Sequence, residues 1–569
     1  MLHYRAIPSV FCILLAAACG LAACSGAVDS GAPGGSAASG AARSAGIAAL
    51  PAVAGRVANR GTVRRAVVPE PSCKPPGGSE SFVGLTDFNY ACGLESTVTA
   101  GYENGIDAFS GDATIGGGSG NDILSGLYGT IAGGEYNLIN GGSNGAVSGG
   151  ASNTVTASYG FVGAGQQNTV AASAGGIVAG ESSSVTAAAT EGFIGGGQSN
   201  IESGSAGAIA GGQSNAVNGL ESFIGTGQSN INDGTRSAIL TGYQNGIGIN
   251  GYEGFIGGGD TNSLLQSGAI VGGSGNGVNG QDGFVGEGTG NHVTGSNGFI
   301  GSGASNLVSG SGGFVGSGSS NGVAGPLGVV GGGQGNQIPG AWGVVGGGYG
   351  NKAGEVATVP GGKNNLATGE GSFAAGIGST AAYGGDFVWS DFASGATALK
   401  GTAANQFLVR ASGGVTFYSS ANLGSGVTLP KGSGSWSMLS DRNAKSDIVS
   451  VSDDDILARV ATLPIDEWSY TTERGVRHVG PMAQDFFAAF NVGEDNRHIT
   501  SIDEDGVALA AIKALNSRVA ARDKAIGALE RRDTELQRRD AQLQQRDAAL
   551  DKKLAVLAAE VRAIQAASR

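Results

Sequence analysis

A short repeat runs through the middle of the chain, from about residue 82 to 380. Each unit joins two apolar residues to a glycine-rich stretch that ends in asparagine, as in Phe193–Asn200, Phe223–Asn230 and Phe299–Asn306. Nineteen units follow one another at steps of 14 to 17 residues, and most steps are 15. A unit this short cannot hold a helix pair or a propeller blade, because those repeats need more than about 30 residues.

One unit instead suits one coil of a β-solenoid: strand, turn, strand, turn. The apolar pair predicts the first strand. The second strand is expected at the residues that follow the asparagine, such as Ile201, Val217, Ile231, Val293 and Val308. Glycine and asparagine are expected at turn positions of positive φ, and a narrow ladder of Ile, Val and Phe is expected to be buried. At ~4.8 Å per coil the rod would be roughly 90 Å long.

Composition excludes several other classes of protein. Glycine makes up 109 of 569 residues but follows no Gly-X-Y period, so the chain is not collagen. The net charge of −13 disfavours a nucleic-acid partner, because phosphate contacts need clustered Lys and Arg. Calcium-binding rolls need a regular Asp where this repeat has Asn. The four histidines form no cluster, so neither a metal nor another cofactor is expected: His3, His292, His478 and His498.

The N-terminus has the pattern of an export signal over residues 1–23. Arg5 is followed by the apolar run Phe11–Ala18, which is too short to span a bilayer. Leu21-Ala22-Ala23-Cys24 resembles the bacterial lipobox, which implies that Cys24 is lipidated and anchors the protein to a membrane. Ser25 follows, and in that family this favours an outer-membrane or cell-surface lipoprotein of a Gram-negative bacterium. The alternative is an ordinary signal peptide.

Residues 24–81 are rich in Gly, Ala, Ser and Pro and predict a flexible tether. Cys73 and Cys92 flank the start of the repeats, and in an oxidising compartment they can pair; two free thiols are the alternative. Residues 381–439 lose the repeat, and alternating stretches such as Phe387–Asp391 predict a β cap or neck that ends the rod. Its aromatic residues are expected to serve packing.

A helical tail closes the chain. Residues 440–510 predict a mixed α/β domain, with short helices over 454–462 and 483–490, and residues 511–569 predict a coiled coil. One core position of the heptads holds Ile512, Val519, Ile526, Leu554 and Val561. The other holds Leu515, Leu529, Leu536, Leu543, Leu550, Leu557 and Ile564.

Three successive heptads break this pattern, because Asp533, Asp540 and Asp547 occupy the first core position. Like charges that face each other there are costly. We therefore expect this part of the coil to be weak and able to splay.

The candidate catalytic residues lie between the glycine-rich repeat region and the helical tail. Ser440 stands five residues before Lys445, and a neutral lysine can take the proton of a serine hydroxyl, so the two can act as nucleophile and base. His478 can orient or assist this pair, but a packed structural role fits it as well. Asp441 and Asn443 are expected to help hold the reacting turn.

The residues around this pair resemble a known family. Leu463–Ile465 is followed by Trp468 and Tyr470, then by His478–Phe486 and Asp503–Val507, ahead of the heptad helix. Over about residues 436 to 569 this order is similar to the C-terminal intramolecular chaperone domain of phage endosialidase tailspikes and related tail fibres.

The resemblance implies a domain that trimerises the chain, helps a β-rich stalk to fold and then cuts itself off. The scissile bond would be Leu439–Ser440, with Ser440 as nucleophile and Lys445 as base. The repeats themselves resemble the β-roll heads of trimeric autotransporter adhesins.

Together these features predict a mainly β protein: a trimeric β-solenoid or β-roll, then a small α/β chaperone domain and a coiled coil. A thin rod buries little surface per chain, so a homotrimer is also a physical expectation. The predicted function is a surface-anchored fibre or adhesin-like protein that cleaves itself. One alternative is a fibre or adhesin with a permanent, uncut trimer clamp. A glycan-cleaving tailspike is a weaker alternative, because the repeats show no convincing pair of catalytic carboxylates. No residue identifies a surface ligand.

Overall fold

The computed structural model describes residues 81–83, 88–392 and 397–569. The predicted signal segment, the tether, Cys24 and Cys73 lie outside these ranges, so those predictions stay untested. Within the described ranges no helix combines the length and the apolar character needed to cross a bilayer.

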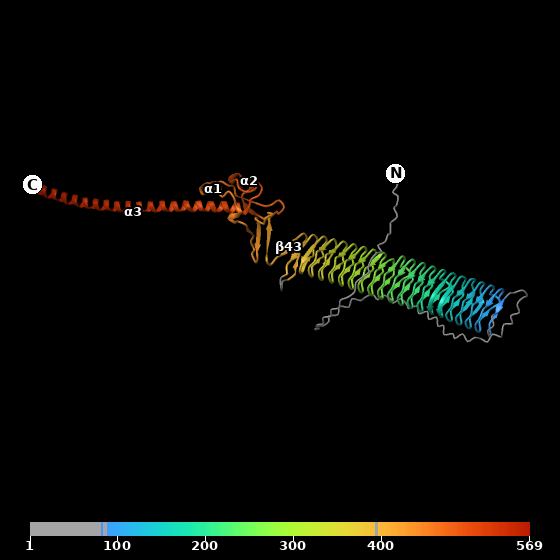
Figure 1. Cartoon of the computed structure of the whole chain (residues 1–569). Coiled ribbons are helices and arrows are strands. Elements are labelled where there is room, and N and C mark those ends of the chain that lie inside the picture. The colour runs from blue at the N-terminus through green and yellow to red at the C-terminus, as the bar shows by residue number, and fades with distance from the viewer. Residues whose placement is uncertain (1–80, 84–87, 393–396) are drawn as a thin grey trace, which may run out of the picture. The chain divides into compact units, whose positions relative to one another are not determined.

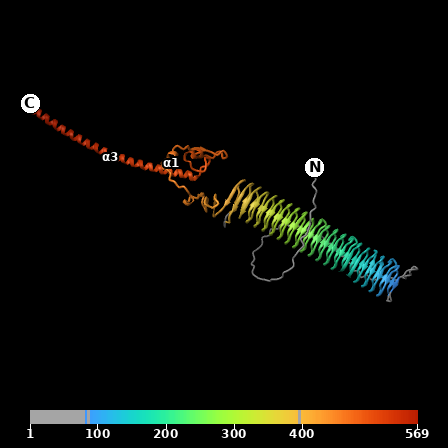
Figure 2. The ribbon, with the colours of Figure 1, turned by 45° about the horizontal axis from the view of Figure 1, so that its top comes forward.

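The repeat region is a β-solenoid, as its period predicts (Figures 1 and 2). The odd-numbered strands, from β1 (Phe82–Val83) to β43 (Phe407–Arg410), form one parallel sheet of 22 strands. The even-numbered strands, from β2 (Tyr90–Ala91) to β42 (Leu399–Lys400), form a second parallel sheet. Most strands are two residues long and pair with the coils before and after, so that Phe223 aligns with Ala208 and Ala238.

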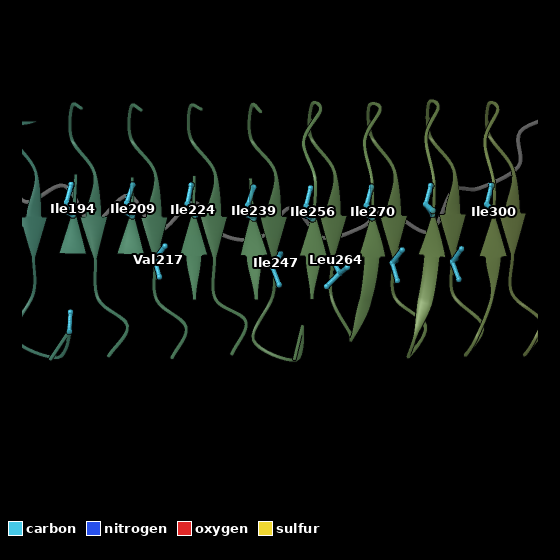
Figure 3. Close-up of a cluster of buried hydrophobic side chains, with 14 of the residues drawn as sticks. Ile194, Ile209, Val217, Ile224, Ile239, Ile247, Ile256, Leu264, Ile270 and Ile300 are labelled. Atoms are coloured by element: carbon cyan, nitrogen blue, oxygen red, sulfur yellow. The ribbon is translucent and has the colours of Figure 1, made fainter. Parts of the chain in front are cut away.

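A ladder of aliphatic side chains fills the space between the two sheets (Figure 3). The second residue of nearly every strand points inward and is fully buried, as at Ile194, Ile209, Ile224, Val217 and Ile247.

The expectation that phenylalanine joins this ladder is wrong. Successive residues of a strand point to opposite faces, so a phenylalanine that precedes a buried isoleucine points outward. Phe193 is 42% exposed and Phe223 is 37% exposed. Neighbouring rings stack along the outer face, and the centroids of Phe284 and Phe299 lie 5.0 Å apart.

The repeated asparagine is a core residue and not a turn residue, which corrects a second expectation. The backbone N–H of Asn230 donates to Oδ1 of Asn215 (3.0 Å), and Nδ2 of Asn230 donates to the Gly242 carbonyl of the next coil (2.9 Å). Similar contacts continue along the rod from Asn104 to Asn365. The carboxamide therefore pairs with backbone groups of adjacent coils that would otherwise be buried without a partner.

Positive φ falls on neighbouring positions instead. Gly227 (φ 110°) fits the expectation for glycine, whereas Ser229 (φ 57°), the residue before the asparagine, takes the left-handed conformation.

One inward position carries a carboxyl group. Glu202, the second residue of β16 (Ile201–Glu202), is fully buried between Val185 and Val217 of the adjacent coils. Its Oε1 accepts the Gly204 N–H at 2.8 Å, while Oε2 has no hydrogen-bond partner among the described residues. Burial raises the pKa of Glu202 to about 8, although the Gly204 hydrogen bond opposes the shift. The side chain is thus protonated in the folded rod at neutral pH.

This carboxyl makes rod stability depend on pH. Because the pKa is raised on folding, its contribution is fully present below the unfolded value of about 4.5 and is lost as pH rises through about 8. We expect the denaturant concentration at the unfolding midpoint of the rod to fall as pH rises from about 4.5 to about 8. Glu202→Gln should remove this dependence, and the exposed-site control Glu287→Gln should keep it. An unchanged pH profile in Glu202→Gln would contradict the assignment.

The solenoid continues beyond the expected boundary at residue 380. Strands β39 (Phe373–Gly376), β41 (Phe387–Ser390) and β43 pair in parallel, so the first part of the expected neck belongs to the rod. The period lengthens here, but Val388 still points into the core, and Phe387 stacks between Phe373 and Phe407 with centroids 4.7 Å away on each side. The alternation of buried and outward-facing side chains therefore continues in coils where the 15-residue sequence repeat has ended.

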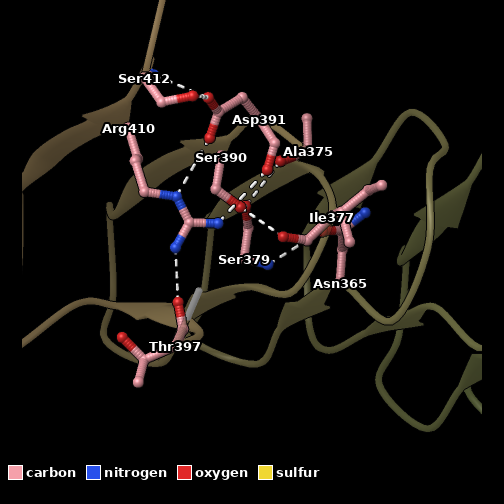
Figure 4. A network of polar contacts seen from close by, with 9 residues as sticks. All are labelled: Asn365, Ala375, Ile377, Ser379, Ser390, Asp391, Thr397, Arg410 and Ser412. Carbon is pink, nitrogen blue, oxygen red and sulfur yellow. Dashed lines mark hydrogen bonds and ion pairs between the residues drawn. The ribbon is translucent and has the colours of Figure 1, made fainter. Parts of the chain in front are cut away.

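An ion pair braces the last coil (Figure 4). Arg410 Nε contacts Asp391 Oδ1 at 3.1 Å. Both the hydroxyl and the backbone N–H of Ser412 donate to Asp391 Oδ2. These hydrogen bonds, with the Arg410 guanidinium, hold the pKa of Asp391 below its usual value.

A three-stranded antiparallel sheet follows: β44 (Gly414–Tyr418), β45 (Gly426–Pro430) and β46 (Ser437–Met438). Next come the 3-10 turn η1 (Arg442–Ala444), helix α1 (Asp453–Val460), the hairpin β47 (Asp466–Trp468) and β48 (His478–Gly480), and helix α2 (Ala483–Phe490). Both short helices lie where the sequence predicts them.

The long helix α3 spans Ser501–Ala567. It begins before the expected residue 511, because Thr500 caps it: Thr500 Oγ1 accepts the Asp503 N–H at 3.3 Å and donates to Asp503 Oδ2 at 2.7 Å. Its first turns pack on α1, where Lys513 Nζ lies 2.6 Å from Asp453 Oδ2.

Candidate active site

The candidate site lies in the turn that follows β46. The Leu439 N–H donates to the Gly426 carbonyl at 3.4 Å, a long contact at the end of the sheet. Asp441 then caps η1, because its Oδ1 accepts the Asn443 N–H at 2.8 Å and Asn443 Nδ2 at 3.2 Å. Asp441 and Asn443 therefore shape the turn that leads from Ser440 to Lys445.

This turn folds Lys445 back onto Ser440. Lys445 Nζ lies 2.7 Å from Ser440 Oγ, which is hydrogen-bond distance. An amine in contact with a hydroxyl has the geometry of a base beside its nucleophile. The peptide bond from Leu439 to Ser440 is the nearest one in sequence that this hydroxyl could attack.

The surroundings of the pair differ from those expected. Ser440 and Lys445 are both exposed in the single chain, so one chain does not supply the burial that would favour a neutral lysine.

His478 lies in an aromatic cluster on the β47–β48 hairpin. Its ring stacks on Trp468 with centroids 4.8 Å apart and meets Tyr470 edge-on at 5.5 Å. Its Nε2 lies 3.8 Å from Glu473 Oε2. No hydrogen bond among the described residues joins His478 to Ser440 or Lys445. These contacts are those of a packed histidine.

One contact near the site was not foreseen. The Ser501 hydroxyl, on the first residue of α3, donates to Met438 Sδ at 3.6 Å. It ties the start of the long helix to the strand that precedes Leu439. The Thr500–Asp503 capping pattern is the sequence signal that could have placed this helix start.

The other candidate residues lie apart from this turn. Cys92 is disulfide-bonded, but Cys73 is outside the described ranges, so their pairing stays a prediction. In the part of the chain that the structure describes, no three His, Cys, Asp or Glu side chains are placed to hold a metal ion.

Comparison with known families gives a match that starts at Ser440. Residues 440–492 match the family model Peptidase_S74, chaperone of endosialidase. No curated protein matches the chain. The endosialidase-chaperone segment, residues 440–492, contains η1, α1, the β47–β48 hairpin and α2. Such a segment behind a β-solenoid fits a tail-fibre-like trimeric protein.

Proposed function

We propose that this chain is a trimeric fibre protein whose C-terminal part drives assembly of the rod and then cuts itself between Leu439 and Ser440. The observation that carries the proposal is the 2.7 Å contact of Lys445 Nζ with Ser440 Oγ, at the first residue of the endosialidase-chaperone segment. The family's name as a peptidase supports self-cleavage as the chemistry.

The reaction uses groups of this chain and one water. Neutral Lys445 takes the hydroxyl proton of Ser440, and Oγ attacks the Leu439 carbonyl carbon. The bond from that carbon to the Ser440 nitrogen breaks, the nitrogen takes a proton, and an ester joins Leu439 to Ser440 Oγ. Water hydrolyses the ester, which frees the Leu439 carboxylate and restores the hydroxyl. Each chain reacts once.

Assembly rests on the heptad seam of α3, which is the exposed stripe formed by the residues at the two core heptad positions from Ile512 to Ile564. Leu536, Leu543 and Leu550 are 52–55% exposed in the single chain and repeat every seven residues. Such a stripe is buried when helices pair as a coiled coil. Three joined tails would hold three rods in register, and this matters because parallel sheets with open edges fold slowly and aggregate.

Assembly can also switch on the cut. Since Lys445 is exposed in one chain, cover from neighbouring chains would favour its neutral form only after the trimer has formed. The same exposure favours a second candidate function, a permanent trimer clamp that is never cut, if neighbouring chains leave Lys445 in water.

Surface anchoring through Cys24 belongs to the proposal and rests on the Leu21–Cys24 pattern alone. Incorporation of a labelled fatty acid, lost in Cys24→Ala, tests it. Equal labelling of both proteins would contradict the anchor.

The chaperone role is tested by a chain that ends at Leu439. We expect it to yield little trimeric, protease-resistant rod, whereas the full chain carrying Ser440→Ala yields an assembled, uncut rod. Native mass and limited proteolysis distinguish the two. A truncated chain that assembles as well as the full chain would contradict the role.

A further inference from the structure

The weak part of the heptad seam carries a second regular feature. An arginine stands directly before each of the three core aspartates: Arg532 before Asp533, Arg539 before Asp540 and Arg546 before Asp547. Within the single helix Asp533 accepts a hydrogen bond from Gln537 Nε2 at 3.0 Å, and Arg539 Nη2 lies 3.1 Å from Glu535 Oε1. All these side chains are exposed.

Coiled-coil geometry brings the two kinds of residue together across chains. With Leu536 and Leu543 at the fourth heptad position, each aspartate occupies the first position and each arginine the seventh of the heptad before. In a parallel coiled coil a first-position side chain enters a hole on the neighbouring helix, and the preceding seventh-position residue forms one wall of that hole. Asp533 would therefore face Arg532 of the neighbouring chain.

The fifth heptad positions leave two of the three arginines without a charged partner on the neighbouring helix. A seventh-position arginine commonly pairs with the fifth position of the next heptad on its neighbour. Here that residue is Gln537 for Arg532 and Gln544 for Arg539, both neutral. For Arg546 it is Asp551, so only this arginine has a second carboxylate to bind on the neighbouring helix. The guanidinium can instead bind the core carboxylate through two parallel hydrogen bonds.

We propose that the partner seated on this part of α3 is a second copy of the same helix, parallel and in register, and that three Asp–Arg pairs per neighbouring pair of chains set that register. The inference rests on the proposed trimer. It replaces the expectation that the helices splay apart here, because each layer of core aspartates is flanked by an equal number of arginines.

A shift by one heptad shows why the pairs select a register. Asp533 of the shifted chain would lie beside Ala525 and Ile526 of its neighbour, with no cation. Asp547 of that neighbour would meet Leu554 and Lys553, so the unpaired carboxylate is that of Asp533. A buried, unpaired carboxylate is strongly unfavourable. Only the unshifted parallel alignment gives every aspartate an arginine.

Charge exchange in the full chain tests this inference, in a Ser440→Ala background that keeps the tail attached. One variant changes the three aspartates to arginine, a second changes Arg532, Arg539 and Arg546 to aspartate, and a third carries both sets. We expect each set alone to raise the concentration at half assembly at least roughly tenfold, and the combined variant to recover most of that loss. Arg531→Asp with Arg538→Asp, outside the seam, is the control.

Register has its own readout. Ser568 falls at the first heptad position, so Ser568→Cys should form a disulfide between chains in the parent and the combined variant and much less in each single set. A combined variant no better than either set, or single sets that assemble as well as the parent, would overturn the pairing. A parent that stays monomeric would instead overturn the proposed trimer.

Discussion

Ser440→Ala is expected to leave the chain uncut, because no hydroxyl remains to attack the Leu439 carbonyl. Lys445→Ala should do the same, since the only side chain within hydrogen-bond distance of that hydroxyl in the turn is Lys445. The cut should slow at least roughly 10³-fold in either variant, the usual scale for loss of a nucleophile or its base. Intact mass of the folded proteins measures the uncut fraction.

Substitutions nearby separate chemistry from folding. Lys445→Arg keeps the positive charge but cannot act as a base, so it should also stay uncut. Ser446→Ala and Lys431→Ala change other exposed residues and should be cut like the parent. If the Ser440→Ala protein still releases a fragment that runs from residue 440 to Arg569, the dyad is contradicted.

Loss of the α3 seam is expected to abolish assembly. Leu529, Leu536 and Leu543 are 52–64% exposed in the single chain, so their replacement by alanine should cost the monomer little. In an assembled coil each side chain would be buried, and each truncation would cost about 2–5 kcal/mol. We expect the triple variant to stay monomeric where the parent is trimeric, with its helix content retained.

The matched control lies on the same helix. Val556 is 58% exposed but sits outside the heptad seam, so Val556→Ala should leave assembly unchanged. Native mass and circular dichroism of both proteins give the comparison. A triple variant that remains trimeric would show that α3 does not hold the chains together.

The sequence predicts the rod well because its period encodes coil length directly. Strands fall at the expected pairs, such as Phe223–Ile224, and the buried isoleucines follow from alternation. Period alone does not tell which polar residues point inward, so the role of Asn230 as a buried ladder residue was missed and Glu202 was not singled out. The extension through β43 was missed because its coils keep the packing but lose the period.

At the candidate site the sequence predicts the pair and not its environment. The five-residue spacing and the Asp441 cap bring Ser440 and Lys445 together locally, which a sequence can indicate. The proposed cover of Lys445 would come from neighbouring chains, and a single sequence holds no direct record of them. The place of His478 among Trp468 and Tyr470 depends on hairpin register.

The most direct measurement is the intact mass of the purified wild-type chain after folding, with the N-terminal residue of every species. We expect two species, one ending at Leu439 and one running from Ser440 to Arg569, with the second appearing only once trimers have formed. A single uncut mass in a folded trimer would contradict self-cleavage and leave the permanent clamp as the function.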